Sequence, residues 1–516
     1  MNNFRAKDII SWTISSELPY VRGQLVNQTI DISALPHELS DSVYSAVSTD
    51  SRSLKPGQVF VALTGTSFDG HSFLLQAAEL GAGMLIAKSG HPELEKLKLD
   101  MPELLFLNPA QPSSMVPVVN SIRHLGTPIV LEVPDTLWAL QQIACGYRHQ
   151  LKAKVIAVTG SVGKTSTREM ISCCLSVGGN VHQTTANLNN EIGLPQTLLA
   201  ADREHDFVVV EMGMRGLGQI DLLSRIACPD ISVITNIGWS HLEHLGSREN
   251  ILKAKTEIVA GMSDNSVLII NQDDELLSAW QKQGHSPVKT VGYSVYAELR
   301  DQTMRDIWAE NIYSDSQSTS FEAVTEDNRC NVRINLPGQH HVSNALAGLL
   351  VARLAGVEME AAAMHILNYR NTGLRQRIIR LKSVCIMDDT YNAAPESMIT
   401  AIKTISDMAS GQRVIGVLAG MLELGNYSEA AHQLVGRAAA EAGFSELCLF
   451  GDDSAQIEMG SRQVSTDIIV SYYNSHDKLA AYLKSIIRPG DYILVKGSRA
   501  FAMDKITAEL EAFLEG

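Results

Sequence analysis

The segment Val155-Ile-Ala-Val-Thr-Gly-Ser-Val-Gly-Lys-Thr-Ser-Thr167 contains residues suited to binding phosphate. Glycines at 160 and 163 let the backbone turn N–H groups toward an anion, and a following helix start adds partial positive charge. Lys164 is placed to reach the terminal phosphates of a nucleotide, and the Thr165 hydroxyl is a candidate Mg²⁺ ligand. The strict pattern G-x-x-x-x-G-K-[S/T] fails at Val158, but the Gly-Lys-Thr half lies between an apolar run and a helical pattern. The predicted nucleotide-contacting residues are Gly160, Ser161, Val162, Gly163, Lys164, Thr165 and Ser166.

Two further side chains follow apolar, β-branched runs downstream of this loop. Glu211 ends the run that begins at Phe207, and His241 lies shortly after the run that begins at Ile231. Ligands of open parallel sheets bind beyond the carboxyl ends of the strands, so Glu211 is expected to join Thr165 on one Mg²⁺ ion. A carboxylate that caps the next helix is the plainer alternative. For His241 the alternatives are a second metal site and an ordinary solvated or core histidine.

Short apolar runs alternating with helical patterns must position these groups. Such runs, without strict alternation of apolar and polar residues, are typical of buried parallel strands. The sequence therefore predicts an α/β fold with parallel sheets, in which a mixed α/β stretch precedes the phosphate loop and a smaller α/β unit follows it. The expected strands are 59–63 before the loop, 155–159, 207–211, 231–236 and 267–271 around it, and 384–389, 414–418, 447–451 and 492–496 after it.

Composition narrows the possible partners of the chain. Its 516 residues suggest about three domains. A net charge of −15 argues against a nucleic-acid-binding surface, and no stretch reaches the ~18 apolar residues of a membrane span. The seven cysteines form no C-x-x-C pair, and the start resembles no signal peptide, so buried thiols and a cytoplasmic location are expected.

Longer motifs resemble those of the Mur ligase family, the ATP-dependent amide-forming enzymes of peptidoglycan precursor assembly. The family motifs are the phosphate loop, Thr184-Thr-Ala-Asn-Leu-Asn-Asn-Glu-Ile-Gly-Leu-Pro195, Asn236…His241, Lys253-Ala-Lys255 and Gly338-Gln-His-His-Val-Ser-Asn-Ala345. Three further motifs resemble those of the Mur ligases that add D-alanyl-D-alanine. They are Asp388-Asp-Thr-Tyr-Asn-Ala-Ala-Pro-Glu-Ser-Met398, Met421–Ser428 and Val495–Arg499. Thr49-Asp-Ser-Arg52 with Asp69-Gly-His71 resembles a uridine-nucleotide-binding domain.

This resemblance implies three domains and a particular set of ligands. The implied domains are a UDP-substrate domain at 1–145, a central ATPase at 146–370 and a C-terminal Rossmann-like domain at 371–516. ATP and two Mg²⁺ ions are implied, with Thr165 and Glu211 on the first ion and His241 on the second. Lys255 corresponds to a lysine that family members carbamylate, although propensity alone would place exposed lysines there. The other implied nucleotide contacts are Asn344, Arg375 and Asp389.

The implied reaction joins D-alanyl-D-alanine to UDP-N-acetylmuramoyl-tripeptide through an acyl phosphate. The implied catalytic residues are Lys164, Lys255, His241 and Arg375. The general base that accepts the amine proton is open among His241, Glu191 and the carbamate. The implied substrate-binding residues are Ser51, Arg52, Thr184, Asn187, Asn190, Glu191, Tyr391 and Asn392. A monomer is expected.

Several positions depart from the family pattern. Gly420 stands where relatives carry an acid, and residues 90–126 have no clear counterpart, so a surface insertion is expected there. The nearest alternative is a ligase that adds the third amino acid, but its Asp-Asn-Pro-Arg motif is missing. The phosphate loop is also compatible with a nucleotide-binding regulatory protein without chemistry and, more remotely, with a folylpolyglutamate-type ligase.

Overall fold

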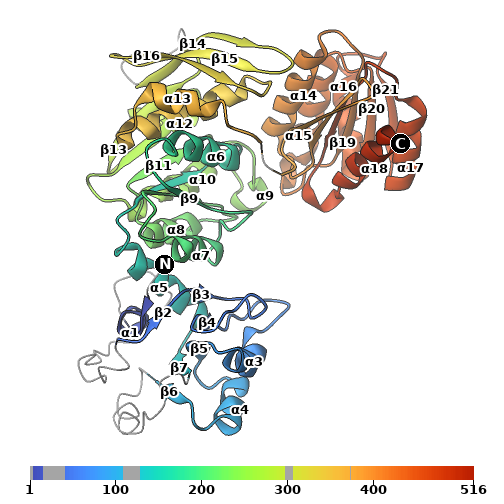
Figure 1. Ribbon diagram of the computed structural model, residues 1–516. Helices are drawn as coiled ribbons and strands as arrows, with labels where there is room; N and C mark the ends of the chain where they lie inside the picture. Colours follow the sequence, from blue (N-terminus) through green and yellow to red (C-terminus); the bar gives the residue numbers. More distant parts are fainter. Residues whose placement is uncertain (1–3, 15–40, 109–127, 297–305, 372) are drawn as a thin grey trace.

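The computed structural model describes residues 4–14, 41–108, 128–296, 306–371 and 373–516. Three lobes follow one another along the chain: the N-terminal lobe in blue, the central lobe in green to yellow, and the C-terminal lobe in orange to red (Figure 1). Each lobe contains its own largely parallel sheet flanked by helices. The α/β fold predicted from the sequence is confirmed.

The N-terminal lobe is a parallel five-stranded sheet of order β3-β4-β5-β7-β6 with a small antiparallel ribbon, β1-β2. Its strands are β1 (Phe4–Arg5), β2 (Val43–Tyr44), β3 (Val47–Ser48), β4 (Val59–Val61), β5 (Met84–Lys88), β6 (Leu105–Leu107) and β7 (Ile129–Val133). Its helices are α1 (Ala6–Ile14), η2 (Gly70–Phe73), α3 (Leu74–Glu79), α4 (Pro92–Asp100) and α5 (Thr136–Arg148). The expected domain boundary near residue 145 falls inside α5.

The stretch 90–126, expected to be a surface insertion, contributes to the packed lobe. Leu94 and Leu97 of α4 are buried in the core, and β6 is the edge strand beside β7, with Leu107 also buried. The physical reason is that Leu94 and Leu97 bury apolar surface on one face of the sheet and Leu107 on the other. Residues 109–127 lie outside the described part of the chain.

The central lobe has a nine-stranded sheet of order β16-β15-β14-β13-β12-β11-β8-β10-β9. The pairings from β9 to β14 are parallel, and β14, β15 and β16 form antiparallel pairs. Its strands are β8 (Lys154–Thr159), β9 (Val181–Gln183), β10 (Phe207–Glu211), β11 (Ile231–Ile234), β12 (Val267–Asn271), β13 (Lys289–Ser294), β14 (Ile307–Ser314), β15 (Thr319–Val324) and β16 (Arg329–Ile334). The four strands expected here are present.

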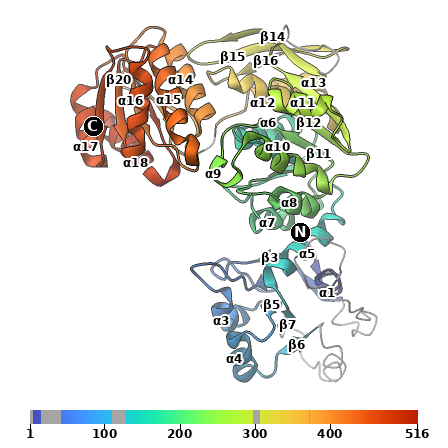
Figure 2. The ribbon, with the colours of Figure 1, turned by 180° about the vertical axis from the view of Figure 1, so that it is seen from behind.

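Helices cover both faces of the central sheet (Figure 2), which explains why its inner strands are apolar throughout. Val155 and Ala157 of β8 pack on the side of α5, α7 and α8, whereas Ile156 and Val158 pack with α6, α12 and α13. The helices are α6 (Lys164–Leu175), α7 (Gly193–Ala200), α8 (Gln219–Ala227), α9 (Leu242–Leu245), α10 (Arg248–Thr256), η5 (Glu257–Gly261), α11 (Glu275–Lys282), α12 (His340–Ala355) and α13 (Met359–Ile366).

The C-terminal lobe has a six-stranded sheet of order β17-β18-β22-β19-β20-β21, parallel except for the β17–β18 pair. Its strands are β17 (Arg377–Leu381), β18 (Val384–Asp389), β19 (Val414–Ala419), β20 (Glu446–Phe450), β21 (Ile469–Tyr473) and β22 (Tyr492–Lys496). Its helices are α14 (Pro395–Ala409), η7 (Gly425–Tyr427), α15 (Ser428–Glu441), η8 (Asp452–Ser454), α16 (Ala455–Arg462), α17 (His476–Ile486), η9 (Arg499–Phe501) and α18 (Asp504–Glu515).

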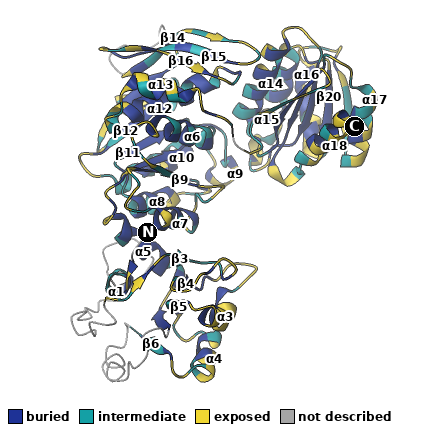
Figure 3. Cartoon of the chain, in the orientation of Figure 1, coloured by how far each residue is buried: buried dark blue, intermediate teal, exposed yellow. Residues whose placement is uncertain are grey.

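The lobes differ in how their cores connect. One apolar core runs through α5 from the N-terminal sheet into the central sheet, and the C-terminal lobe has separate cores on the two faces of its own sheet (Figure 3). Across the described residues, no helix has both the length and the apolar character needed to cross a bilayer. The seven cysteines all lie in described segments and form no disulfide; five are buried, and Cys173 and Cys228 are half-buried.

Candidate active site

A cavity of 1380 Å³ lies where the central and C-terminal lobes meet and extends to the start of α5. Its walls combine the phosphate loop, the carboxyl ends of β10 and β11, the linker around Arg375, and the carboxyl ends of β18 and β22. Parallel strands bring their carboxyl ends to one edge of a sheet, so both sheets present polar residues to the same space. This arrangement is suited to binding two substrates against one nucleotide.

The phosphate loop joins β8 to α6 and is held by the end of β11. Gly163 has φ +85°, and a side chain at Gly160 would collide with the Thr235 hydroxyl, so glycine is required at both positions. The Asn236 amide oxygen accepts hydrogen bonds from the Ser161 and Val162 backbone N–H groups at 3.1 and 2.9 Å. The sequence motif therefore folds as a strand–loop–helix unit, with its conformation fixed by the neighbouring strand.

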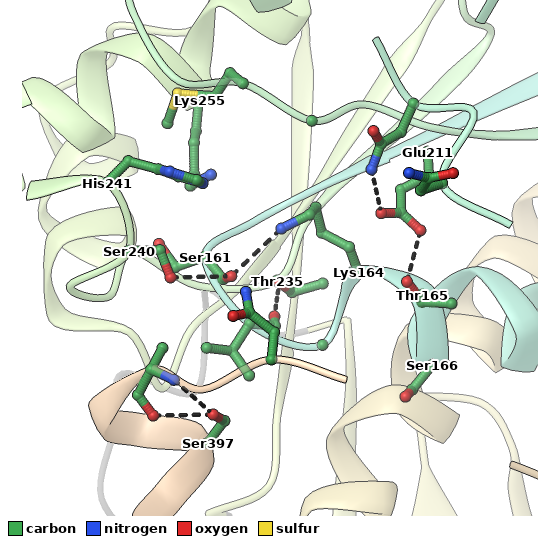
Figure 4. A pocket seen from close by; sticks show the side chains of 18 of the residues that line it. Ser161, Lys164, Thr165, Ser166, Glu211, Thr235, Ser240, His241, Lys255 and Ser397 are labelled. Atoms are coloured by element: carbon green, nitrogen blue, oxygen red, sulfur yellow. Dashed lines mark hydrogen bonds between the residues drawn. The ribbon is translucent and has the colours of Figure 1, made fainter. Parts of the chain in front are cut away.

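Lys164 begins α6 and lies over this loop. Its Nζ donates hydrogen bonds to the carbonyl oxygens of Gly160 at 2.8 Å and Ser161 at 3.3 Å (Figure 4). Burial lowers the pKa of Lys164, and Arg375 contributes in the same direction, opposed by Glu211. An anion placed between Lys164 and Arg375 would relieve the unfavourable proximity of these two cations.

The expected pair for a first Mg²⁺ ion is in contact. The Thr165 hydroxyl donates a hydrogen bond to one Glu211 oxygen at 2.8 Å, and the Asn189 amide donates to the other at 2.9 Å. Adjacent oxygens around octahedral Mg²⁺ are about 3 Å apart, because each lies about 2.1 Å from the metal. Glu211 is buried, with the Arg168 guanidinium 3.8 Å away and the Lys164 ammonium as a second neighbouring charge. These residues therefore fit a Mg²⁺ ligand pair in charge, atom type and spacing.

Lys255, on α10, is buried at 2% exposure and lines the cavity beside Lys164. Burial, and secondly the charge of Lys164, hold the pKa of the Lys255 amine well below its usual value. The amine is therefore far more easily neutral than an exposed lysine. In contrast, Lys253 is exposed on the same helix.

His241 precedes α9 in a left-handed conformation and meets a carboxylate from the C-terminal lobe. Its Nδ1 lies 2.6 Å from Glu423, which accepts the hydrogen bond and so leaves Nε2 with a free lone pair in the neutral ring. Burial lowers the pKa of His241 to about 4, with Lys164 contributing and Glu423 opposing. A neutral imidazole held by a carboxylate has the form in which histidine binds metal ions.

The linker and the C-terminal lobe supply the remaining predicted nucleotide contacts. The Arg375 guanidinium stacks 3.8 Å above the Tyr391 ring, and Asp389 forms a buried 2.6 Å ion pair with Lys496. Asn344 lies across the cavity, where its amide oxygen accepts a hydrogen bond from Thr167 at 3.0 Å. The predicted ATP-binding set thus lies around one cavity, apart from Gly160, which supports the loop from behind.

The predicted substrate residues divide into two groups. Those that line the cavity are Asn187, Asn190, Glu191, Tyr391 and Asn392. Three others do not line it: Ser51, Arg52 and Thr184. Thr184 is buried and accepts a hydrogen bond from the Glu211 backbone N–H at 3.0 Å, which makes it a support for the end of β10.

Ser51 and Arg52 lie in the N-terminal lobe. Ser51 is buried, and the Arg52 guanidinium is exposed and forms a 2.7 Å ion pair with Asp50. Just before them, the Thr49 hydroxyl accepts a hydrogen bond from Gln196 of α7, and the start of this helix follows the cavity residues Asn190 and Glu191. The segment that contains Thr49, Ser51 and Arg52 is therefore connected to the cavity through α7.

Sequence reasoning did not single out four charged or polar groups of this site: Asn189, Glu396, Glu423 and Lys496. Lys496 ends a buried strand, so the reasoning that identified Glu211 would also have identified it. Glu423 and Glu396 act across the lobe boundary, on His241 and on the backbone N–H of Trp239 respectively. Neither partnership has a signal in the local sequence.

The fold and the site define a P-loop enzyme that acts on an anionic nucleotide between two α/β domains. Three family models match the chain: the Mur ligase family catalytic domain over residues 43–147, the Mur ligase middle domain over 158–352, and the Mur ligase glutamate ligase domain over 375–499. The chain belongs to the Mur ligase family of ATP-dependent, amide-bond-forming enzymes.

Relatives and solved structures agree over nearly the full length. The chain is 34% identical over 503 residues to a UDP-N-acetylmuramoyl-tripeptide--D-alanyl-D-alanine ligase of Bacillus subtilis, covering 97% of this chain and 99% of the relative. It resembles the crystal structure of MurF from Acinetobacter baumannii with a TM-score of 0.78, at 27% identity and 99% coverage of both chains. The chain also resembles the crystal structure of MurF ligase from Thermotoga maritima in complex with ADP. The TM-score is 0.74 at 26% identity, with 91% of this chain and 98% of that chain covered.

Proposed function

We propose that this enzyme joins D-alanyl-D-alanine to UDP-N-acetylmuramoyl-tripeptide, with ATP converted to ADP and phosphate. The observation that carries the proposal is the single cavity in which the phosphate loop, the lysine of α10 and the C-terminal strand ends face one another. The similarity to D-alanyl-D-alanine ligases over 97% of the chain supports this choice of substrates. The cavity continues past Asn190 and Glu191 to Trp138 and Gln141 of α5, which gives the nucleotide-linked peptide a path toward the N-terminal lobe.

The first step activates the terminal carboxylate of the tripeptide. Its oxygen attacks the γ-phosphorus of ATP, the bond to ADP breaks, and an acyl phosphate forms. Lys164 and Arg375 both line the cavity and would stabilise the developing negative charge on the phosphoryl oxygens. Mg²⁺ bound by Thr165 and Glu211, with a second ion at His241, would neutralise further phosphate charge.

The second step forms the amide bond. The amine of D-alanyl-D-alanine attacks the acyl carbon, a tetrahedral intermediate forms, and phosphate leaves with the electrons of the broken C–O bond. No nucleophile from the protein is needed, because the enzyme acts by positioning and by electrostatics. Tyr391, Asn392 and the Asp389–Lys496 pair line the cavity from the C-terminal lobe, where they would contact the reacting groups.

Carbamylation of Lys255 is part of the proposal. A lysine reacts with CO₂ only as the neutral amine, and burial beside Lys164 favours that form. The reaction of the neutral amine with CO₂ forms an N–C bond, releases one proton and leaves an anionic carbamate, which is attracted to Lys164. The carbamate would then orient Mg²⁺ and the phosphates.

The test is a phosphate-release assay with ATP, Mg²⁺, UDP-N-acetylmuramoyl-tripeptide and D-alanyl-D-alanine. Release is expected only when both the tripeptide and the dipeptide are present. The dipeptide-free reaction gives the background, and free amino acids with the UDP-linked dipeptide test the ligase that adds the third residue. No release above background would contradict the proposal, and preference for a free amino acid would establish the third-residue ligase. Tight ATP binding without turnover on any acceptor would favour a regulatory protein.

A further inference from the structure

Among the described residues, two groups of three metal-type side chains lie outside the active site: Asp69, His71 and His91 in the N-terminal lobe, and Cys145, His149 and Cys228 at the far end of α5. In the first group, both ring nitrogens of each histidine already form hydrogen bonds. His71 Nε2 and His91 Nδ1 accept backbone N–H groups, so their other nitrogens carry the protons that Asp69 accepts at 2.8 and 3.0 Å. A metal at Asp69 would require both rings to lose those protons, so this group is a structural clamp.

The second group brings together residues 83 positions apart in sequence. Cys145 and His149 are one turn apart at the end of α5, and Cys228 terminates α8. One ligand atom from each side chain lies within 4.8 Å of the other two. Both sulfur atoms also face one carbonyl, that of Arg225, at 3.8 Å from Cys145 and 3.1 Å from Cys228.

The local conformation directs the two thiols toward each other. Cys228 has φ +40° and ψ +64°, a left-handed conformation that helix ends usually give to glycine or asparagine. A side chain larger than glycine in this conformation is uncommon, and such strain is characteristic of functional positions. In this case it places the sulfur beside the end of α5.

The chemistry of the surroundings suits a metal ion with affinity for sulfur. The hydrogen bond from the Cys145 thiol lowers the pKa of Cys228 to about 7, against the effect of burial, and Arg148 contributes to the lowering. The thiolate is the form of cysteine that binds metals. The site also lies at the carboxyl ends of two helices, where the helix dipoles favour a cation.

We propose that Cys145, His149 and Cys228 form a binding site for a soft divalent cation of the Zn²⁺ type, with the fourth position open to water. Tetrahedral bonds of about 2.3 Å to sulfur and 2.0 Å to nitrogen require ligand atoms roughly 3.5–3.8 Å apart. The ligand atoms lie within 4.8 Å of one another, so they need to approach by at most about 1.3 Å. His149 is exposed and among the described residues its ring makes no hydrogen bond, so it is able to complete this movement.

The position gives the site a structural consequence. Helix α5 begins at the cavity with Leu137, Trp138 and Gln141, and α8 begins there with Gln219 and Leu222. Both helices then run away from the cavity and end at the cysteines. A metal ion at this site would therefore cross-link the far ends of the two helices that form the substrate wall, and would join the N-terminal lobe to the central lobe.

The test uses the full-length protein, reduced and freed of metal, and titrated with Co²⁺ as a spectroscopic substitute for Zn²⁺. One equivalent is expected to produce a thiolate-to-cobalt charge-transfer band and the intense visible bands of a tetrahedral site, and Zn²⁺ is expected to bleach both. Co²⁺ bound at the nucleotide site would have oxygen and imidazole ligands and produce no thiolate band, because no cysteine lines that cavity among the described residues.

Matched variants sharpen the result. Cys228→Ser is expected to weaken binding by roughly 100-fold or more, and His149→Gln by about tenfold. The control Cys173→Ser changes another half-buried thiol and is expected to bind like the wild type. Absence of the band in the wild type, or an unchanged band in both site variants, would overturn the proposal.

A second measurement needs no variant. In the wild-type protein, Zn²⁺ is expected to slow alkylation of Cys228 by iodoacetamide and to leave the alkylation rate of Cys173 unchanged, as followed by mass spectrometry of peptides. Equal rates at Cys228 with and without Zn²⁺ would contradict the metal site even if a site variant failed to fold.

Discussion

The two junctions between lobes are built in opposite ways. At the first, α5 contributes Leu140, Ile143 and Ala144 to an apolar core shared by the N-terminal and central sheets, and Tyr147 donates a buried hydrogen bond to Ala201 at 2.8 Å. At the second, Glu423 contacts His241, and Glu396 accepts a hydrogen bond from the Trp239 backbone at 2.9 Å. Trp239 is the side chain that packs against the cores on both sides.

The difference between the two junctions implies that the first contributes mainly to stability and the second mainly to catalysis. A shared apolar core resists relative motion, because opening it would expose buried surface to water. Polar contacts across a single linker are exchanged for water at little cost, so relative motion of the lobes is the ordinary expectation there. The reacting groups lie at the second junction, where such motion can admit substrates and then enclose them. Changes at the first junction should therefore affect stability, and changes at the second should affect turnover.

The largest effect on turnover is expected from Lys255→Ala. Loss of the buried amine removes the proposed carbamate, and the rate of phosphate release should fall by roughly 10³-fold. Short carboxylic acids should partly restore the rate by occupying the space of the carbamate. Lys253→Ala, on the exposed side of the same helix, is the control and should retain full activity. Full activity of Lys255→Ala would refute the role of this lysine.

A substitution in the apolar core of the first junction should lower stability and leave turnover nearly unchanged. Leu140→Ala removes a fully buried side chain, and the free energy of unfolding should fall by about 3 kcal/mol, with kcat nearly unchanged in the protein that remains folded. Leu99→Ala, at a position 83% exposed, is the control and should change stability by less than about 0.5 kcal/mol. Denaturant titration measures both. A drop in kcat for Leu140→Ala without loss of stability would refute the claim that the first junction affects stability and not turnover.

Glu423→Gln tests the contact that crosses the second junction. The neutral amide no longer holds the His241 proton as strongly, so kcat should fall about tenfold, with the free energy of unfolding unchanged because Glu423 is partly exposed. The matched control is Glu429→Gln, at an exposed position in the same lobe. Equal kcat in the two variants would mean that the contact is incidental.

A smaller effect is expected on the pH dependence of the free energy of unfolding, from a histidine beneath the segment that carries Glu423. His432 is fully buried, and its Nε2 accepts the Met421 N–H at 2.9 Å, next to the segment that carries Glu423. Burial lowers the pKa of His432 in the folded protein. The folded state thus binds fewer protons than the unfolded state, whose pKa is about 6.5, so stability is lost as the pH falls below that value.

Comparison of the unfolding free energy at several pH values measures this effect. The slope below about pH 6.5 should be shallower in His432→Asn than in the wild type, because the titrating group is gone. The exposed His285→Asn is the control and should retain the wild-type slope. Identical slopes in all three proteins would show that His432 does not contribute.

Much of this molecule is predictable from local sequence. The β-branched runs predicted strands within one or two residues of their bounds, since buried parallel strands need continuous apolar character. The phosphate loop and Glu211 were also predictable, because strand ends of one sheet meet at one edge. The substrate contact predicted for Thr184 remains a prediction; the structure adds that its hydroxyl supports the backbone of Glu211, which the motif alone did not indicate.

What could not be predicted depends on contacts between distant segments. The partnership of Glu423 with His241 joins residues 182 positions apart, and nothing local distinguishes Glu423 from a surface acid. The same is true of the Cys145–Cys228 pair, since each cysteine alone indicates only a buried thiol. The functional role predicted for Lys255 came only from the family resemblance, because helix propensity favours an exposed lysine at that position, and its burial was not predicted.

The separate cores of the last lobe bear on how such a chain can be rearranged. A crossover between related genes in the codons for residues 371–376 would exchange residues 377–516 as a unit with its own closed interior. A crossover just after α5 would instead combine two halves of one interior that had not evolved together. Diversification by exchange of the C-terminal lobe is therefore structurally permitted at the second junction and penalised at the first.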